Sequence, residues 1–310
     1  MTDKVADSFL AAVDPTKTKV VAFPEYVAVF GGPISPKHGR GKTPKSQRDA
    51  FLRWVRNNRP KLEANLILPE SYDDWNDFDT YTDLLLFERD LGVLTNAVLI
   101  FVEGPGAIAE LGAFSQIDTL SERLVIVVTE NHHPKKSFIS LGPIRSVAAT
   151  QKRPSSVCVI PNVKGADLIT HMPVVMDTLD EKRQPAATTA FNSKESQHQI
   201  LLILDLINLF TVTTIKELHD LSRGLGVDLQ TKRLNQILFA LKKTQLVVGR
   251  HYGTAEYFVA KGLKSTYIDF TAKTGAQAFN RERLKAKRWI EIESDYNRKA
   301  ALTLVSKAAA

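Results

Sequence analysis

Five short apolar runs limit what the first half of this chain can fold into. Each run has four to six residues without polar alternation, and they are Val27–Phe30, Asn65–Leu68, Ala97–Val102, Leu124–Val128 and Val157–Ile160. Runs of this kind are typical of strands buried on both faces of a sheet. Helical patterns occupy the stretches between them, notably Ser46–Asn57, Tyr81–Leu94 and Ala107–Ile117. Strands that alternate with helices predict an α/β fold with a doubly wound, parallel, five-stranded sheet.

The chain length and a change of composition predict two domains. At roughly 150 residues per domain, 310 residues are enough for two. The segment Arg183–Ser193 interrupts the strand and helix pattern with Pro, Ala and Thr, as linkers do. We therefore expect a first domain over residues 1–183, a linker over 184–194 and a second domain over 195–310.

The second domain has the pattern of three helices followed by a hairpin. Gln197–Phe210 is apolar enough for a core helix, and Thr214 with Glu217 fits a capping box that starts a second helix. Asp228 is positioned to cap a third helix, whose apolar residues Leu234–Leu241 repeat at helical spacing. Two strand-like runs around Gly253 predict a hairpin. This outline predicts a winged helix-turn-helix, and Arg281–Ala309 then forms either a long helix or a fraying tail.

The net charge of +7 lies entirely in the second domain. Residues 195–310 contain 18 Lys and Arg against 11 Asp and Glu, whereas residues 1–194 are balanced. A basic domain beside a neutral one is typical of contact with a polyanion such as nucleic acid, although such an excess can also serve solubility alone. The candidate contacts are Lys232, Arg233, Lys242 and Lys243 on the third helix, Arg250 in the wing, and Arg283 and Lys287 with their neighbours Arg281, Lys285 and Arg288.

Other functional classes find little support in the sequence. No apolar run approaches the roughly 20 residues of a membrane span, and the N-terminus lacks the layout of a signal peptide, so we expect a cytoplasmic protein. One cysteine, Cys158, cannot form an internal disulfide or a cysteine-rich metal site. The pair His132-His133 has no accompanying cluster of ligands, and we expect a surface loop there, with no metal and no cofactor.

Glycines and carboxylates follow the predicted strands where ligands bind in doubly wound sheets. Gly31 and Gly32 follow the first strand, Glu70 follows the second, and Glu103, Gly104 and Gly106 follow the third. These residues converge on one edge of the predicted sheet.

Among the candidate functional residues, Glu110 has the most informative sequence context. It is the sole ionisable residue of the otherwise apolar stretch Ala107–Phe114, which predicts a buried helix. A buried carboxylate must be hydrogen-bonded, ion-paired or directed at a ligand cavity. We expect Glu110 in the first turn, where the helix dipole favours an anion.

The sequence Gly41-Lys42-Thr43 is only superficially similar to a phosphate-binding loop. Pro36 occupies the position of the glycine that makes the tight turn in such loops. We expect the basic residues Lys37, Arg40, Lys42 and Lys45 either to lie in a solvated loop or to cover an anionic ligand.

The segment EGPGAIAELGAF at 103–114 resembles the nucleoside 2-deoxyribosyltransferase superfamily. Together with KKSFISLGPIRSV at 135–147, Pro69-Glu70 and the winged-helix outline, it resembles the effectors of bacterial type II retron systems. The resemblance implies a deoxyribosyltransferase-like domain fused to a winged helix, and partners that are a reverse transcriptase and its multicopy single-stranded DNA.

The resemblance also implies an activity, which is hydrolysis of an N-glycosidic bond with NAD as substrate and toxicity within antiphage defence as outcome. Glu110 would stabilise or attack the anomeric carbon, with Glu70 and Glu88 contacting ribose hydroxyls or orienting Glu110 and Arg145 reaching a phosphate. Glu88 and Arg145 could instead be solvated or structurally paired.

One departure from the superfamily bears on the reaction. Its members commonly place a base-holding aspartate before the glutamate, and here Gly104 and Pro105 stand in that stretch, with Glu103 the nearest acid. This difference argues for hydrolysis over base exchange. The resemblance further implies that a neighbouring subunit of a homo-oligomer can complete the site. A nucleotide-sensing winged-helix transcription regulator without catalysis is the alternative function.

Overall fold

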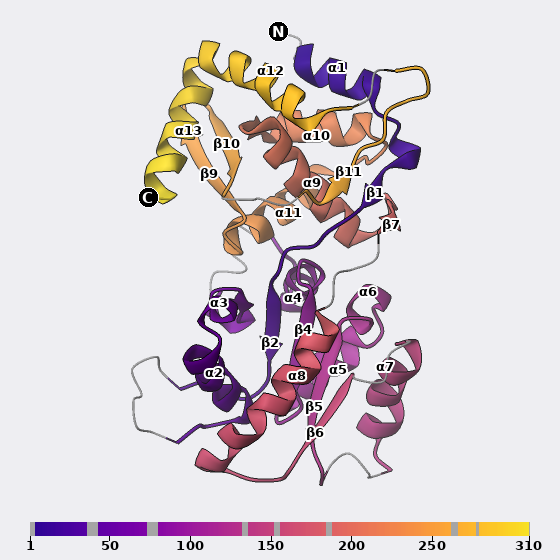
Figure 1. The fold of residues 1–310 in the computed structure, drawn as a ribbon, viewed down its shortest axis with the longest axis vertical. Coiled ribbons are helices and arrows are strands. Elements are labelled where there is room, and N and C mark those ends of the chain that lie inside the picture. The colour runs from indigo at the N-terminus through magenta and orange to yellow at the C-terminus, as the bar shows by residue number, and fades with distance from the viewer. Residues whose placement is uncertain are drawn as a thin grey trace. The chain divides into compact units, whose positions relative to one another are not determined.

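The chain forms two compact units in a computed structural model (Figure 1). The structure describes residues 4–35, 43–72, 80–131, 136–151, 156–183, 188–261, 266–276 and 279–309. The sheet unit is made of Pro24–Asp74 and Asp83–Pro185, and the helical unit of Met1–Phe23, Trp75–Thr82 and Ala186–Ala310. The chain therefore passes repeatedly between the units, whereas the sequence analysis divided it at a single linker.

The sheet unit is built on the five-stranded parallel sheet that the sequence predicts. Its strands have the order β3-β2-β4-β5-β6, and every neighbouring pair is parallel. They are β2 (Val27–Phe30), β3 (Leu66–Ile67), β4 (Ala97–Phe101), β5 (Leu124–Thr129) and β6 (Val157–Ile160). The three central strands β2, β4 and β5 are buried throughout, as their continuous apolar runs require. Strand order reverses between β2 and β4, which is where such sheets bind ligands.

Helices cover both faces of this sheet. On one face, α2 (Gln47–Asn58) and α8 (Met172–Lys182) pack on alternate strand residues such as Val29, Leu99 and Val127. Opposite them lie α4 (Leu84–Val93), α5 (Pro105–Phe114) and α6 (Asp118–Ser121), with the ring of Phe114 on α5 edge-on to Phe30 of β2. The remaining helical segments are α3 (Pro60–Glu63), η2 (Pro69–Ser71), η4 (Ser140–Ile144), α7 (Arg145–Thr150) and η5 (Gly165–His171).

The helical unit contains the three predicted helices and the predicted hairpin. The helices are α9 (Ser196–Phe210), α10 (Ile215–Gly224) and α11 (Thr231–Lys243). The hairpin consists of β9 (Val247–Tyr252) and β10 (Ala255–Ala260), paired antiparallel, with β8 (Thr213–Thr214) added beside β10. The capping box of Thr214 and Glu217 is confirmed. Asp228 is not a cap, because α11 begins after Gln230 and has no side-chain cap.

Both ends of the chain contribute to the helical unit. A second small sheet has the order β11-β1-β7 and joins Lys19–Val20 (β1) to Ile268–Asp269 (β11) and Thr189–Ala190 (β7). Strand β7 lies within the predicted linker, whose described part is therefore structured. The N-terminal α1 (Lys4–Ala12) also belongs to this unit, and its Phe9 packs edge-on to Phe210 and Phe270.

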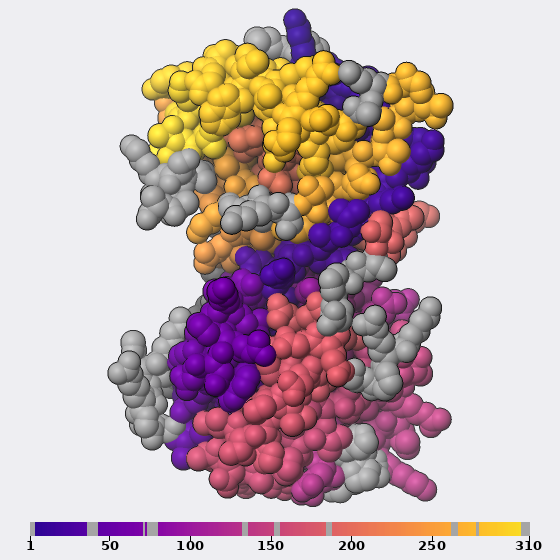
Figure 2. All heavy atoms as spheres, viewed as in Figure 1, coloured from indigo at the N-terminus to yellow at the C-terminus, as the bar shows by residue number. Residues whose placement is uncertain are grey.

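The end of the chain is two helices and not one. Helix α12 (Arg281–Ser294) ends at Asp295, and α13 (Tyr296–Ala309) follows directly. In Figure 2 these helices form a continuous yellow area on the surface of the helical unit. Trp289 and Ile290 of α12 are exposed, whereas Arg288 between the packed Leu284 and Ile292 is buried.

Candidate functional site

The loops after β2 and β4 meet where the strand order reverses, and Glu103 joins them. Its Oε1 accepts hydrogen bonds from the backbone N–H groups of Gly32 (2.9 Å) and Arg48 (3.1 Å), and its Oε2 accepts one from Gln47 (2.6 Å). Gln47 and Arg48 are the first residues of α2, whose unpaired N–H groups favour an anion. Glu103 thus holds the start of α2 against the end of β4. Its two oxygens are occupied by backbone donors.

Close packing explains the two glycines after β2. A Cβ at Gly32 would lie 2.9 Å from the Glu103 carboxylate, and one at Gly31 would lie 2.9 Å from the Cβ of Phe101. Gly31 also has a φ of 149°, which disfavours other residues. By contrast, a Cβ at Gly104 or Gly106 would meet no atom within 4 Å. The space beside the start of α5 is therefore open at Gly104 and Gly106, which the sequence analysis predicts to contact a ligand.

Arg48 is a buried cation that the sequence analysis did not single out. Its side chain is 4% exposed, donates from Nε to the carbonyl oxygen of Gly32 (2.8 Å), and forms an ion pair with Glu70 through Nη1. The sequence does contain a pattern that indicates the burial of Arg48. Arg48 stands at helical spacing from Phe51, Leu52 and Val55, so it lies on the apolar face of α2.

Glu110 lies in the second turn of α5. The helix begins at Pro105, earlier than expected, so the prediction of a first-turn position is wrong. The prediction of a fully buried helix is also wrong, because Ala107, Leu111 and Phe114 are buried but Ile108 is 39% exposed. The Oε2 atom of Glu110 is itself buried and has no hydrogen-bond partner in the described part of the chain. Burial and an unpartnered oxygen leave this carboxylate poorly stabilised as an anion.

Three glutamates and Arg48 form an acidic cluster, which we define as Glu70, Glu88, Glu110 and Arg48. Burial, then the charge of Glu70, raise the pKa of Glu110 to about 7, and Arg48 opposes this rise. Burial, then the charges of Glu110 and Glu70, raise the pKa of Glu88 on α4 to about 8. Glu88 is only 6% exposed, so its side chain is not on a solvated helix face. Both shifts favour the protonated forms of Glu88 and Glu110 over the ionised ones.

The other predicted site residues fall into two groups. Arg145 is exposed at the start of α7, and no contact places it with the acidic cluster. Lys45 is exposed, and its backbone N–H donates to Asp49 (2.9 Å). Five further residues that the sequence analysis considered lie outside the described part of the chain, namely Lys37, Arg40, Lys42, His132 and His133.

Most predicted nucleic-acid contacts on α11 also make contacts within the protein. Lys242 forms an ion pair with Glu256 (3.0 Å), and the Lys243 Nζ lies 4.9 Å from the ring centre of Phe239. Arg233 donates to Ser196 Oγ (2.6 Å). The exposed members of the predicted set are Lys232, Arg250, Arg283 and Lys287.

Two arginines of the C-terminal helices are structural. Arg281 forms an ion pair with the buried Asp205 (2.6 Å), and Arg288, which is 2% exposed, forms one with Glu217 (2.9 Å). Arg298 of α13 also reaches Glu217 (2.7 Å). Expectations that Arg281 and Arg288 extend a basic surface are therefore wrong.

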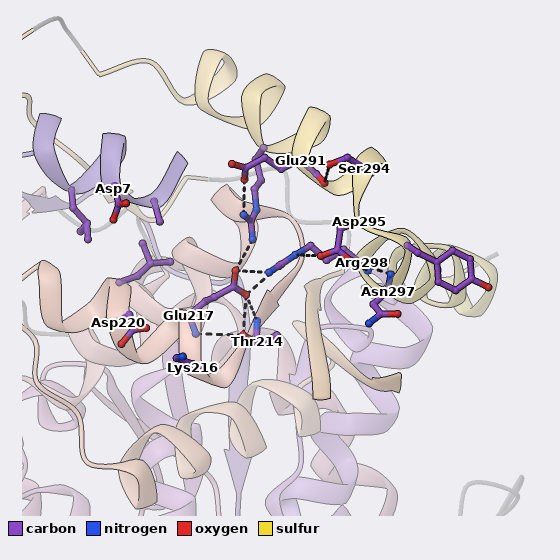
Figure 3. A pocket seen from close by; sticks show the side chains of 15 residues that line it. Asp7, Thr214, Lys216, Glu217, Asp220, Glu291, Ser294, Asp295, Asn297 and Arg298 are labelled. Atoms are coloured by element: carbon purple, nitrogen blue, oxygen red, sulfur yellow. Dashed lines mark hydrogen bonds and ion pairs between the residues drawn. The ribbon is translucent and has the colours of Figure 1, made fainter. Parts of the chain in front are cut away.

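Figure 3 shows a pocket of the helical unit with a volume of about 930 Å³, whose lining residues include Glu217, Arg288 and Arg298. Glu217 stands at the centre of the dashed contacts, and Arg288 in turn contacts Glu291 (2.8 Å). The two arginines lower the pKa of Glu217 to about 2, against the effect of its burial. Acidic and basic groups neutralise each other here, so the polar centre of the pocket is already paired.

Comparison with known proteins identifies the family. The model described as STM3845 retron effector protein matches residues 44–249, more than half of the chain. The chain belongs to this retron effector family. The matched region begins near the start of α2 and ends in β9, so it includes the acidic cluster and α11 of this family member.

Two *Escherichia coli* proteins show local similarity. The "Retron Ec86 putative ribosyltransferase/DNA-binding protein" is 32% identical over 84 residues, which are 27% of this chain and 27% of that protein. The "Retron Ec73 putative ribosyltransferase/DNA-binding protein" is 37% identical over 65 residues, 21% of each. The chain thus matches about a quarter of the length of these curated relatives.

Two further findings concern the described residues alone. They contain no group of three or more His, Cys, Asp or Glu side chains arranged to hold a metal ion. Among their helices, none combines the length and apolar character that crossing a bilayer requires.

Proposed function

We propose that this retron effector cleaves an N-glycosidic bond, with NAD as substrate, and that Glu110 is the catalytic residue. The observation that carries the proposal is the buried, unpartnered Glu110 Oε2 atom within the acidic cluster. Groups with strongly shifted pKa values gather at functional sites. The names of the two *Escherichia coli* relatives support a ribosyl substrate, and the open space at Gly104 and Gly106 gives a ligand room beside α5.

The proposed reaction breaks the bond between C1′ of the ribose and the pyridinium nitrogen of NAD. The bonding electrons leave with nicotinamide, which becomes neutral and needs no proton. Positive charge then develops on the ribose, and ionised Glu110 stabilises it or bonds to C1′ before water replaces the leaving group. Water supplies the hydroxyl of ADP-ribose and releases one proton.

Glu88 has a different role in the same proposal. Its raised pKa keeps it protonated at neutral pH, so it can donate a hydrogen bond to a ribose hydroxyl or to Glu110. Activity then needs ionised Glu110 and protonated Glu88. The expected pH profile rises near the pKa of Glu110, about 7, and falls near that of Glu88, about 8.

Substitution of Glu110 tests the activity. We expect Glu110→Gln to lower NAD hydrolysis by at least about 10²-fold, because the amide cannot stabilise developing positive charge. NAD is measured in cells that express the protein and in a purified assay. The matched control is Glu122→Gln, since Glu122 is an exposed glutamate of the same unit. If the Glu110→Gln protein hydrolyses NAD at the wild-type rate, the catalytic assignment is wrong.

We propose that the helical unit is a winged helix-turn-helix that binds the nucleic acid of the retron complex. The order α9, α10, α11 and the β9–β10 hairpin support the fold, and the exposed Lys232 and Arg250 support contact with phosphates. The partners are then the retron reverse transcriptase and its multicopy single-stranded DNA. Copurification with these partners, and its loss at high salt, tests this assignment.

We further propose that a second copy of the chain covers part of the sheet unit. Leu84 and Leu85 of α4 and Ile108 of α5 are 42%, 47% and 39% exposed, on the helices that carry Glu88 and Glu110. Exposed apolar side chains are typical of protein interfaces when they are contiguous. Sedimentation of the wild type and of Leu85→Lys tests it. A monomeric wild-type protein would contradict the proposal.

A further inference from the structure

The helical segment that follows β5 leaves one side uncovered. Its exposed residues Phe138, Leu141 and Arg145 recur at intervals of three and four residues, so they share a side of η4 and the start of α7. Phe138 is 85% exposed and Leu141 is 55% exposed. We call these three residues the Phe138 face. Apolar residues at such spacing ordinarily pack on another element, so their exposure requires an explanation.

The opposite side of the same segment is packed into the sheet unit. Pro143 and Ile144 of η4 and Val147 of α7 are buried. The start of the segment is capped, because the Oγ of Ser137 accepts the backbone N–H of Ser140 (3.3 Å). These contacts anchor the segment without the Phe138 face. We therefore expect substitutions on that face to leave the stability of the fold nearly unchanged.

Gly142 provides space for the ring of Phe138 along the helix. A Cβ at Gly142 would lie 3.7–3.8 Å from three atoms at the far end of this ring, Cζ, Cε1 and Cε2. One end of the ring thus lies against the helix, and the rest of its surface is open. The turn is also a wide π-helical one, a geometry that is frequent at functional sites. An aromatic ring held in this way loses little freedom when a ligand binds.

The chain path brings the Phe138 face to the edge of the sheet that carries the candidate site. Strand β5 ends at Thr129 beside β4, and Gly104 and Gly106 follow β4. Helix α5 connects β4 to β5, whereas η4 and α7 connect β5 to β6. Right-handed crossovers in one direction cover the same face of a sheet, and α7 contacts α6 (Figure 1). The segment therefore lies on the same side of the sheet as α5, one strand further along.

The charge of this segment suits a ligand that is both aromatic and anionic. Residues Lys136–Thr150 include two basic residues, Lys136 and Arg145, and no acidic one. Both basic residues are exposed. Exposed aromatic rings stack on nucleobases, and basic side chains form charge-assisted hydrogen bonds with phosphates. The adenosine diphosphate half of NAD combines a base with two phosphates.

We propose that the Phe138 face binds the adenosine diphosphate half of the substrate. Phe138 stacks on the adenine and Arg145 contacts the diphosphate, while Glu110 acts at the other end, on the ribose that carries nicotinamide. The diphosphate crosses the start of α5, where Gly104 and Gly106 leave space. This inference rests on the proposed function for the identity of the substrate. It makes Phe138 a residue that selects a dinucleotide over a mononucleotide.

A comparison of two substrates tests this assignment, because nicotinamide mononucleotide has the scissile bond of NAD but no adenosine. We expect Phe138→Ala to lower kcat/KM for NAD about tenfold, mainly through KM, and to leave hydrolysis of the mononucleotide unchanged. Phe138→Trp keeps an aromatic ring and should retain activity on NAD. The matched control is Val174→Ala, since Val174 is a 54% exposed apolar residue of α8.

Binding of ADP gives a readout that does not depend on catalysis. Calorimetry is done on the full-length wild type, Phe138→Ala, Arg145→Gln and Val174→Ala. We expect the first two variants to bind ADP about tenfold more weakly than the wild type and Val174→Ala to match it. Wild-type affinity for ADP in Phe138→Ala and Arg145→Gln, or no binding of ADP by the wild type, would overturn the proposal.

Failure of this binding site can be distinguished from failure of the proposed function. If ADP binding depends on Phe138 but neither the wild type nor Glu110→Gln hydrolyses NAD, the adenosine diphosphate site stands and the proposed activity is wrong. If Phe138→Ala changes only the sedimentation of the protein, with wild-type KM for NAD and wild-type affinity for ADP, a second copy of the chain covers this face. The inference is then wrong while the proposed activity stands.

Discussion

Among the described residues, Glu217 of the helical unit is ion-paired with two arginines, whereas Glu88 and Glu110 of the sheet unit form no ion pair. Glu217 accepts hydrogen bonds from the guanidinium groups of Arg288 and Arg298 and caps α10, so its pKa falls to about 2. In the sheet unit, Arg48 pairs with Glu70, and the pKa values of Glu88 and Glu110 rise to about 8 and 7.

This contrast separates a carboxylate that stabilises a fold from one that is available for chemistry. The charge of Glu217 is compensated within the protein, and removing it takes from Arg288 and Arg298 the carboxylate that they share. The charges of Glu88 and Glu110 are not compensated, so the fold is more stable when they are protonated. A ligand with developing positive charge would supply what the acidic cluster lacks.

The largest effect on stability is expected from Glu217→Gln. Breaking a buried pair by removal of one partner costs about 3–5 kcal/mol, because the remaining charges stay buried. Glu293→Gln is the control, since Glu293 pairs with Lys299 while both are largely exposed. Urea unfolding of the three proteins measures the difference. Equal losses in the two variants would remove the distinction between the units.

Acid should weaken the helical unit through the same residue. The pKa of Glu217 is depressed in the folded state, so its contribution is complete above the ordinary value near 4.5 and is lost as pH falls toward 2. We expect about 2 kcal/mol of stability to disappear across this window. Glu217→Gln should show a flatter dependence between pH 5 and 2, which thermal unfolding at fixed salt can measure. A wild-type slope in that variant would assign the acid sensitivity to other groups.

Glu88→Gln should change the stability of the fold in the opposite direction, so that the variant is more stable than the wild type at high pH. The pKa of Glu88 is raised in the folded state, so the wild type loses stability as pH rises from about 4.5 to about 8. The neutral amide avoids this loss, and we expect a gain of about 1 kcal/mol at pH 8 with no gain at pH 4. Melting temperatures at both pH values measure it, with Glu122→Gln as the exposed control. A variant that melts below the wild type at pH 8 would show that Glu88 is a paired structural residue.

The smallest effect concerns the one cation of the acidic cluster. Arg48 lowers the pKa of Glu110, so Arg48→Met should move the acidic limb of the activity profile upward by about one pH unit or less. Arg48→Lys, which keeps the charge, should leave that limb closer to its wild-type position. An acidic limb that is identical in all three proteins would show that Glu110 does not set it.

Several elements of the fold follow from local patterns in the sequence. The strands are visible as apolar runs because a sheet covered on both faces excludes polar alternation. The capping box at Thr214 and the hairpin at Gly253 depend on neighbouring residues, so they could be located directly.

Features that depend on distant contacts were harder to predict. Nothing local marks Lys19–Val20 as the partner of β11, and no pattern around Tyr81 predicts its contact with Gln236 on α11. Arg281 and Arg288 look like a solvated basic row, since the acids that pair with them are far away in the sequence. Glu103 was expected near a ligand, and its three backbone partners come from the loop after β2 and the start of α2, which only the folded sheet brings to it.

The pairing of β1 with β11 has a consequence for synthesis on the ribosome. Val20 of β1 pairs with Ile268 of β11, so this small sheet can form only after almost the whole chain has been synthesised. The five strands of the parallel sheet lie within residues 27–160 and are complete much earlier. Because domains fold as their segments emerge, the unit with the acidic cluster can fold before the unit that carries α11. Newly made protein would then pass through an interval in which Tyr81 has not yet met its partners on α11.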